Sequence, residues 1–174
     1  MSLEWLGEFV HDVPDFPTPG VLFKDISPLL ADPDALRFAV EAMAEPYVGG
    51  DVDHVAGIDA RGFILGAAVA YRLGCGFVPI RKFGKLPRAT VSRSYDLEYA
   101  NNTIEMHADA FAPGDRVVLV DDVLATGGTA AASLELVADT GADVAGAAFL
   151  IELGFLDGRK RLGTHVPHVL LSYD

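Results

Sequence analysis

The stretch that decides the fold is RVVLVDDVLATGGTAAASLELV, residues 116–137. A strand-like apolar run, 117–120, leads into two adjacent aspartates, Asp121 and Asp122, and a short glycine-containing turn then precedes a helix-like segment. In open α/β sheets, ligands bind in the crevice at the carboxyl ends of the strands. We therefore expect both carboxylates to face a ligand.

The turn from Ala125 to Thr129 is suited to an anion. Gly127 and Gly128 let the backbone approach a ligand closely, and Thr126 adds a hydroxyl donor, as does Thr129. Free amides and the positive end of the helix dipole favour a phosphate at such a helix start. The two carboxylates can accept hydrogen bonds from hydroxyls or bind a metal, and the adjacent turn can bind a phosphate. Together they predict a sugar phosphate as the ligand. The P-loop lysine and the GxGxxG pattern are absent, which disfavours a nucleoside triphosphate or dinucleotide.

Strand-like and helix-like segments alternate around this stretch. Strands are expected at 53–58, 76–81, 117–120, 142–153 and 168–173, and helices at 62–74 and from about 128 to 140. The strand segments are nearly continuous apolar runs, which is typical of strands covered on both faces. The pattern predicts an α/β fold with a mostly parallel sheet.

The N-terminal part and one central segment depart from this rhythm. A helix is predicted from Ser2 through Val10, and another with Asp32 as its N-cap. The proline-rich segment 14–30 between them is expected to be irregular. The polar segment 82–109 predicts a long excursion, a two-stranded flap of the kind that serves as a lid.

Composition excludes several classes of function. The 174 residues predict one domain, and a net charge of −12 argues against binding nucleic acid. No apolar run approaches the ~18 residues of a membrane span, and the N-terminus does not resemble a secretory signal. One cysteine, Cys75, excludes a disulfide framework within the chain and a cysteine metal cluster. A cytoplasmic location is expected.

VVLVDDVLATGGT resembles the phosphoribosyl-pyrophosphate (PRPP) signature of the type I phosphoribosyltransferases. DFPTPGVLFKDISPLL, GIDARGFILG, IRKFGKLP and YDLEY resemble, in the same order, segments of the adenine-specific branch of that family. The resemblance spans about residues 15–156. It implies a single type I phosphoribosyltransferase domain over 1–174, with a central mostly parallel sheet flanked by helices. It also implies a small hood from about 1–35 and a flexible lid of about 82–109.

The resemblance assigns roles at the phosphates and the ribose. Asp121 and Asp122 would bind the ribose hydroxyls, and Arg61 would clamp the leaving pyrophosphate with two parallel donors. The segment DARGF resembles the pyrophosphate loop, where a non-proline cis peptide bond would let backbone groups face the ligand. The further residues implied are Asp59 and Ala60 in that loop, Ala125, Thr126, Gly127, Gly128 and Thr129 at the 5′-phosphate, Lys82 and Lys85 near pyrophosphate, and Arg81 reaching a partner subunit's site.

The resemblance also implies a purine site. Phe23 would stack on the base, and the backbones of Leu22 and Lys24 would read its Watson–Crick edge. Val123 and Leu153 would line the other face. As apolar residues, these two and Phe23 could equally be plain core.

In the lid, Glu98 would handle the proton of the purine imidazole ring, and Tyr99 would shield the site from water. Taken alone, Glu98 is a solvated loop residue; only the resemblance makes it catalytic.

The implied reaction transfers the 5-phosphoribosyl group from PRPP to adenine and releases AMP and pyrophosphate. Mg²⁺ would be bound through PRPP near Asp121 and Asp122, and the enzyme would be a homodimer. A hypoxanthine or guanine phosphoribosyltransferase is one alternative, which the VLFKD and YDLEY segments disfavour. A non-catalytic PRPP-sensing regulator that binds nucleic acid is another, which the charge of −12 disfavours.

Overall fold

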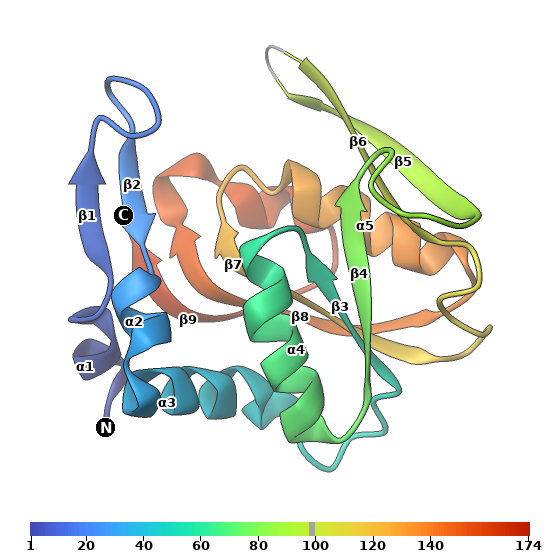
Figure 1. Ribbon diagram of the computed structural model, residues 1–174, viewed down its shortest axis with the longest axis horizontal. Helices are drawn as coiled ribbons and strands as arrows, with labels where there is room; N and C mark the ends of the chain where they lie inside the picture. The colour runs from blue at the N-terminus through green and yellow to red at the C-terminus, as the bar shows by residue number, and fades with distance from the viewer. Residues whose placement is uncertain (98–99) are drawn as a thin grey trace.

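The centre of the molecule is a seven-stranded sheet with helices on both faces (Figure 1). The computed structural model describes residues 1–97 and 100–174. The sheet has the order β5-β6-β4-β3-β7-β8-β9, in which β3, β4, β7, β8 and β9 run parallel. Its strands are β3 (His54–Ile58), β4 (Gly76–Lys82), β5 (Thr90–Leu97), β6 (Ala100–His107), β7 (Arg116–Leu124), β8 (Asp143–Leu153) and β9 (His168–Tyr173). The predicted mostly parallel sheet is confirmed.

Helices on both sides explain why the strands read as continuous apolar runs. Helices α3 (Pro33–Ala44) and α4 (Arg61–Leu73) pack on one face of the sheet, and α5 (Gly128–Asp139) packs on the other. Along β7, Val117 and Leu119 enter the core on the α5 side, whereas Val118 and Val120 enter the core on the α3–α4 side. Because side chains alternate along a strand, two covered faces require an unbroken apolar sequence.

The N-terminal segment differs from the prediction in two places. Helix α1 (Leu3–Gly7) begins after the N-cap Ser2, as expected, but it ends at Gly7 rather than continuing to Val10. The segment 14–30, expected to be irregular, contains β2 (Leu22–Asp25) and α2 (Ser27–Ala31). Pro17, Pro19 and Gly20 lie before β2, so β2 keeps its backbone donors and pairs antiparallel with β1 (His11–Pro14). This two-stranded sheet stands beside β9 in Figure 1.

The central polar segment forms the expected two-stranded ribbon. Strands β5 and β6 pair antiparallel, and β6 also pairs antiparallel with the end of β4, so the ribbon extends the sheet and projects beyond it (Figure 1). Within the described parts of the chain there are also three short 3₁₀ turns: η1 (Glu45–Tyr47), η2 (Gly154–Leu156) and η3 (Gly158–Leu162). Among the residues described, no helix combines the length and apolar character needed to cross a membrane.

Strand order places a crevice between β3 and β7. The chain leaves β3 through α4 toward β4, and it leaves β7 through α5 toward β8 on the opposite side. The connections that leave the carboxyl ends of these two adjacent strands therefore run in opposite directions. Such a position is a topological switch point, where α/β sheets bind ligands.

Candidate active site

A cavity of about 330 Å³ opens at the carboxyl ends of β3, β4 and β7, under the β5–β6 ribbon. It brings together residues that lie more than 60 positions apart in the sequence, from the loop after β3 to the start of α5. The lining residues are Ile58, Asp59, Ala60, Arg61, Ile80, Arg81, Lys82, Tyr95, Ile104, Asp121, Asp122, Val123, Ala125 and Thr129. Most of the predicted PRPP residues thus share one cavity.

The two aspartates lie inside β7, which corrects the expectation that they follow its end. Strand β7 continues to Leu124 because β8 provides pairing partners as far as Glu152. Asp122 is 4% exposed, and its Oδ2 lies 2.8 Å from Nε of Arg61. Burial raises the pKa of Asp121 well above its ordinary value, and the neighbouring carboxylate adds to that shift. Burial also raises the pKa of Asp122, which Arg61 opposes.

The predicted phosphate turn forms a separate hollow of about 80 Å³ between β7 and α5. Gly127 precedes the helix in the left-handed region, with φ of 78°, and no side chain caps the helix start. The first amides of α5 therefore have no side-chain acceptor and are available to an anion. The hollow includes all five predicted turn residues, Ala125, Thr126, Gly127, Gly128 and Thr129.

On the other side of the cavity, the loop after β3 is tied to β4. The Asp59–Ala60 peptide bond is cis, the geometry that the resemblance suggested. Arg81 donates from Nε to Asp59 at 3.0 Å and from Nη1 to the carbonyl oxygen of Lys85 at 3.2 Å. Arg81 thus contacts its own chain, and its predicted reach to a partner subunit stays a prediction. Lys82 lines the cavity, whereas Lys85 does not.

A buried glutamate that the sequence analysis missed supports the loop between β4 and β5. Glu105 on β6 is 2% exposed and accepts hydrogen bonds from the backbone amides of Lys85 and Leu86 at 2.9 and 3.0 Å, and from the hydroxyl of Thr90 at 3.2 Å. Although burial works against its charged form, the hydrogen bonds from the loop amides lower the pKa of this carboxyl. The signal was present in the sequence TIEMH, where a carboxylate stands between two apolar strand residues.

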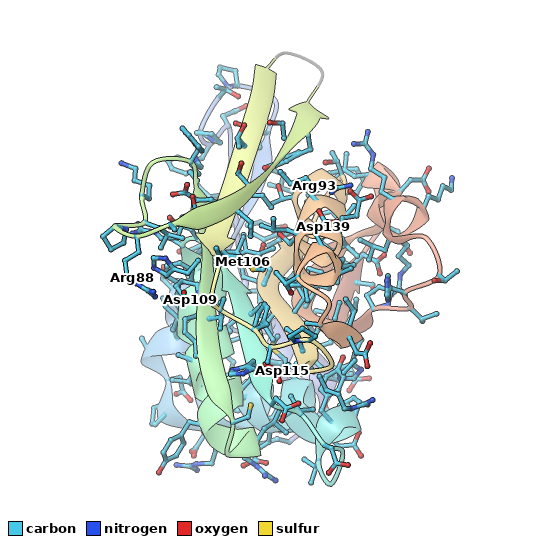
Figure 2. All side chains as sticks on the ribbon, turned by 90° about the vertical axis from the view of Figure 1, so that its right-hand side faces the viewer. Arg88, Arg93, Met106, Asp109, Asp115 and Asp139 are labelled. Carbon is cyan, nitrogen blue, oxygen red and sulfur yellow. The ribbon has the colours of Figure 1, made fainter. Side chains whose placement is uncertain are left out.

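The ribbon reaches the phosphate turn through Tyr95, another residue missed from the sequence. The Tyr95 hydroxyl lies 2.8 Å from the Thr129 hydroxyl, and Tyr95 lines the cavity. Arg93 on β5 pairs with Glu135 and Asp139 on α5, at 2.5 and 2.6 Å. Figure 2 shows Arg93 and Asp139 together where the ribbon passes α5. The ribbon is thus attached over the cavity by contacts with α5.

The residues predicted to bind the purine contribute less to the lining of the cavity than the predicted PRPP residues do. The Phe23 ring lies 4.9 Å from the guanidinium carbon of Arg61, so β2 faces the cavity through this pair. The Lys24 ammonium lies away from the cavity, between Asp12 at 2.5 Å and the Tyr173 ring at 3.8 Å. The side chain of Lys24 is thus engaged elsewhere, and the predicted contact of its backbone with the base stays a prediction.

The remaining purine residues are divided between the cavity and the core. Val123 lines the cavity, whereas Leu153 is not in its lining and packs against the core on the α3–α4 side. Leu22 is 49% exposed on β2. Glu98 and Tyr99, the predicted lid residues, lie outside the described residues, and their roles stay predictions.

Gly62, the glycine after Arg61, leaves no room for a side chain. A Cβ atom there would lie 2.7 Å from Oδ1 of Asp121 and 2.9 Å from the carbonyl oxygen of Val120. We expect Gly62→Ala to push α4 away from β7, raising KM for PRPP about 10-fold or more, since small displacements of binding groups are costly. Steady-state kinetics with varied PRPP would measure this. Gly66→Ala, one helical turn later, is the control because its Cβ would crowd the Phe77 ring at 3.0 Å. An equal effect from both variants would contradict the prediction.

Comparisons with known proteins identify the family of the chain. The chain matches the family model of the phosphoribosyl transferase domain over residues 31–165. It is 56% identical over 171 residues to the adenine phosphoribosyltransferase of Nitrosococcus oceani, covering 98% of this chain and 100% of that relative. The crystal structure of adenine phosphoribosyltransferase from Rhodothermus marinus is 55% identical, with a TM-score of 0.95 and 98% of each chain covered.

A relative of lower identity was solved with ligands. The adenine phosphoribosyltransferase of Saccharomyces cerevisiae, in complex with adenine and an imino-altritol bisphosphate, is 36% identical, with a TM-score of 0.92. The alignment covers 97% of this chain and 98% of the yeast chain.

Proposed function

The chain belongs to the adenine phosphoribosyltransferases of the phosphoribosyl transferase family, and from this we propose that it transfers the 5-phosphoribosyl group of PRPP to adenine, giving AMP and pyrophosphate. One observation carries the proposal. The cavity at the β3–β7 switch point joins the Asp121–Asp122 pair, Arg61 and the start of α5. This set offers acceptors for ribose hydroxyls, a guanidinium for pyrophosphate, and free helix amides for the 5′-phosphate.

The binding of PRPP would rearrange the pair of Arg61 and Asp122. In the structure, Nε of Arg61 lies 2.8 Å from Oδ2 of Asp122. Ribose hydroxyls would donate to Asp121 and Asp122, and the negatively charged pyrophosphate would recruit the guanidinium of Arg61. The cavity also holds Arg81 and Lys82, which bring positive charge to an otherwise acidic chain. Charge leaving with pyrophosphate in the transition state would then be stabilised by cations already in place.

We place Mg²⁺ on the phosphates of PRPP rather than in a protein cage. Within residues 1–97 and 100–174, no three histidine, cysteine or acidic side chains gather in a way that could hold a metal ion. Mg²⁺ keeps several waters and commonly binds one or two carboxylates together with substrate phosphates. Asp121 and Asp122, which line the cavity, fit that pattern. Bound there, the ion would neutralise the leaving pyrophosphate.

The proposal predicts a strong preference for adenine. The backbone carbonyl of Leu22, on β2, would accept a hydrogen bond from the exocyclic amine of adenine, where hypoxanthine carries an acceptor instead. A buried polar group without a partner costs roughly 1–3 kcal/mol, or about 5- to 150-fold in kcat/KM. Product formation from PRPP with adenine, hypoxanthine and guanine in parallel assays measures the preference. Equal efficiency with adenine and hypoxanthine would contradict the base assignment.

The same assay tests the function itself. Formation of AMP and pyrophosphate only when PRPP, adenine and Mg²⁺ are all present is the expected result. Binding of PRPP without turnover of any base would instead support the regulator considered from the sequence.

We also propose that the enzyme is a cytoplasmic homodimer, as the resemblance implies. Ile64 and Tyr71, 49% and 91% exposed, lie seven residues apart on α4 and so share one face of the helix. A second copy of the chain would remove these apolar side chains from water. Sedimentation equilibrium measures the number of subunits.

A further inference from the structure

The outer side of the phosphate turn rests on the backbone of a later loop, residues 154–162. A methyl group on Gly127 would collide with the carbonyl oxygen of Gly158. A methyl group on Gly158 would collide with the carbonyl oxygen of Ala125 and lie 3.1 Å from the amide nitrogen of Gly127. The two backbones touch without intervening side chains. The position of the turn amides therefore depends on where this loop lies.

The loop is tied to the sheet by the residue that follows Gly158. Arg159 donates from Nε to Oε1 of Glu152 at 2.6 Å and from Nη2 to Oε2 at 2.7 Å. Glu152 belongs to β8, is 6% exposed, and stands opposite Leu124, the last residue of β7 before the phosphate turn. The ion pair thus attaches the loop to the sheet level with the start of the turn.

The pairing of Arg159 with Glu152 is of a strong kind. Two parallel hydrogen bonds match the planar guanidinium to the carboxylate and fix its orientation. The hydrogen bond to Glu152 raises the pKa of Arg159 above its ordinary value, which favours the charged guanidinium. The neighbouring pair of Lys160 and Asp157, at 2.7 Å, joins two exposed residues within the loop and does not reach the sheet.

We propose that Arg159, through its pair with Glu152, is a positioning residue for the 5′-phosphate of PRPP. The inference rests on the proposed function, because it assigns the turn from Ala125 to Thr129 to that phosphate. When the pair is lost, the loop is free to shift, and Gly158 no longer holds the turn in the shape that directs its amides at the ligand. Leu162, which is 3% exposed in the core beside α5, keeps the loop folded. Loss of the ion pair is therefore expected to weaken PRPP binding rather than to unfold the loop.

Three single variants distinguish the positioning role of Arg159 from an effect of its charge alone. Arg159→Met removes the pair, Arg159→Lys keeps the charge but loses the two parallel donors, and Lys160→Met removes the same charge from the next residue. KM for PRPP, KM for adenine and kcat are measured for each, with binding of ribose 5-phosphate by calorimetry as a readout independent of turnover. Thermal unfolding midpoints verify folding.

The expected result is a rise in KM for PRPP of about 10-fold or more in both Arg159 variants. We expect a parallel loss of ribose 5-phosphate affinity, a nearly unchanged KM for adenine, and parental behaviour in Lys160→Met. If Arg159→Lys behaves like the parent, or Lys160→Met like Arg159→Met, the residue acts by charge alone and the proposal is wrong. An equal rise in both KM values also overturns it.

Folding failure is controlled by a double variant. Arg159→Met alone leaves the buried carboxylate of Glu152 without its charged partner, which is costly. Glu152→Gln with Arg159→Met removes both charges, leaves the loop untied and should show the same selective rise in KM for PRPP. If this double variant folds and binds PRPP like the parent, the positioning role is refuted. The parent enzyme in the same assay tests the proposed function separately, because a parent without turnover contradicts that function before any variant is compared.

Discussion

Replacing Asp121 and Asp122 together with asparagine is expected to lower kcat/KM for PRPP by about 10²- to 10⁴-fold while the chain stays folded. Each hydrogen bond to a charged group contributes roughly 1.5–3 kcal/mol, and about 1.4 kcal/mol corresponds to a factor of ten. Both carboxylates line the cavity. The ribose hydroxyls would lose two charged acceptors, and any magnesium shared with the substrate would lose its protein ligands.

The stability of this double variant should move in the opposite direction from its activity. Burial raises the pKa of both carboxyls, so ionising the pair costs more in the folded chain than in the unfolded chain, and at pH 7 this difference disfavours the folded state. Asparagine removes that charge. The free energy of unfolding of the variant at pH 7 should therefore equal or exceed that of the parent. The difference should shrink as the pH falls through the raised pKa values, and vanish below the ordinary aspartate value of about 3.9, where the carboxyls are protonated in both states.

Calorimetric titration with PRPP and denaturant unfolding at pH 7 and pH 5 would measure both effects. Asp34→Asn with Asp51→Asn is the matched control, because it removes the same charge from two exposed residues outside the cavity. A double variant that binds PRPP as tightly as the parent would show that the ribose assignment is wrong. A clear loss of stability at pH 7 would show that the pair supports the fold instead.

Glu98→Gln is expected to lower kcat by about 10²- to 10⁴-fold, the usual contribution of a positioned general acid–base group. As N9 of adenine attacks C1′ of the ribose, the imidazole ring must give up its N–H proton. A carboxylate closed over the site could take or return that proton, whereas glutamine keeps the size and hydrogen bonding but cannot accept it. PRPP affinity should stay nearly unchanged, because the PRPP contacts are assigned to Arg61, Asp121, Asp122 and the turn 125–129.

The β5–β6 ribbon allows a sharp control, because Glu98 lies between its two strands in the sequence. Arg93 on β5 pairs with Glu135 on α5, so Glu135→Gln weakens the attachment of the ribbon without touching the proposed acid–base group. Single-turnover measurements of AMP formation, with adenine and PRPP prebound, isolate the chemical step. If Glu98→Gln keeps the parental single-turnover rate, Glu98 is not the acid–base group. If Glu135→Gln lowers the single-turnover rate as much as Glu98→Gln does, the effect arises from the attachment of the ribbon to α5.

Local sequence determined the element types around the site and the residues of the phosphate turn. The apolar runs of β3, β7, β8 and β9 indicated parallel strands, because strands covered on both faces need unbroken apolar sequence. The Asp121–Asp122 pair and the turn 125–129 are contiguous, so their chemistry could be read directly. Even there, the extent of β7 was misjudged, since its last residues are held in the strand by β8.

The local sequence pattern predicted least well those strands that pair without a strong hydrophobic periodicity. Residues 14–30 were expected to be irregular because of their prolines, yet β2 pairs with β1 once the chain has passed Gly20. A proline removes its own backbone N–H and restricts the residue before it, but it does not determine the conformation of residues further along the chain.

Only the tertiary structure decided which distant side chains meet. Arg61 faces Asp122 because β3 and β7 are neighbours, Glu105 holds the Lys85 amide because β6 pairs with β4, and Arg159 reaches Glu152 because the loop after β8 turns back over the phosphate turn. Hydrophobic periodicity reports whether a residue is buried, but the partner of a buried polar group depends on strand order and register. Those are set by packing between segments far apart in the chain, so no local stretch of sequence contains them.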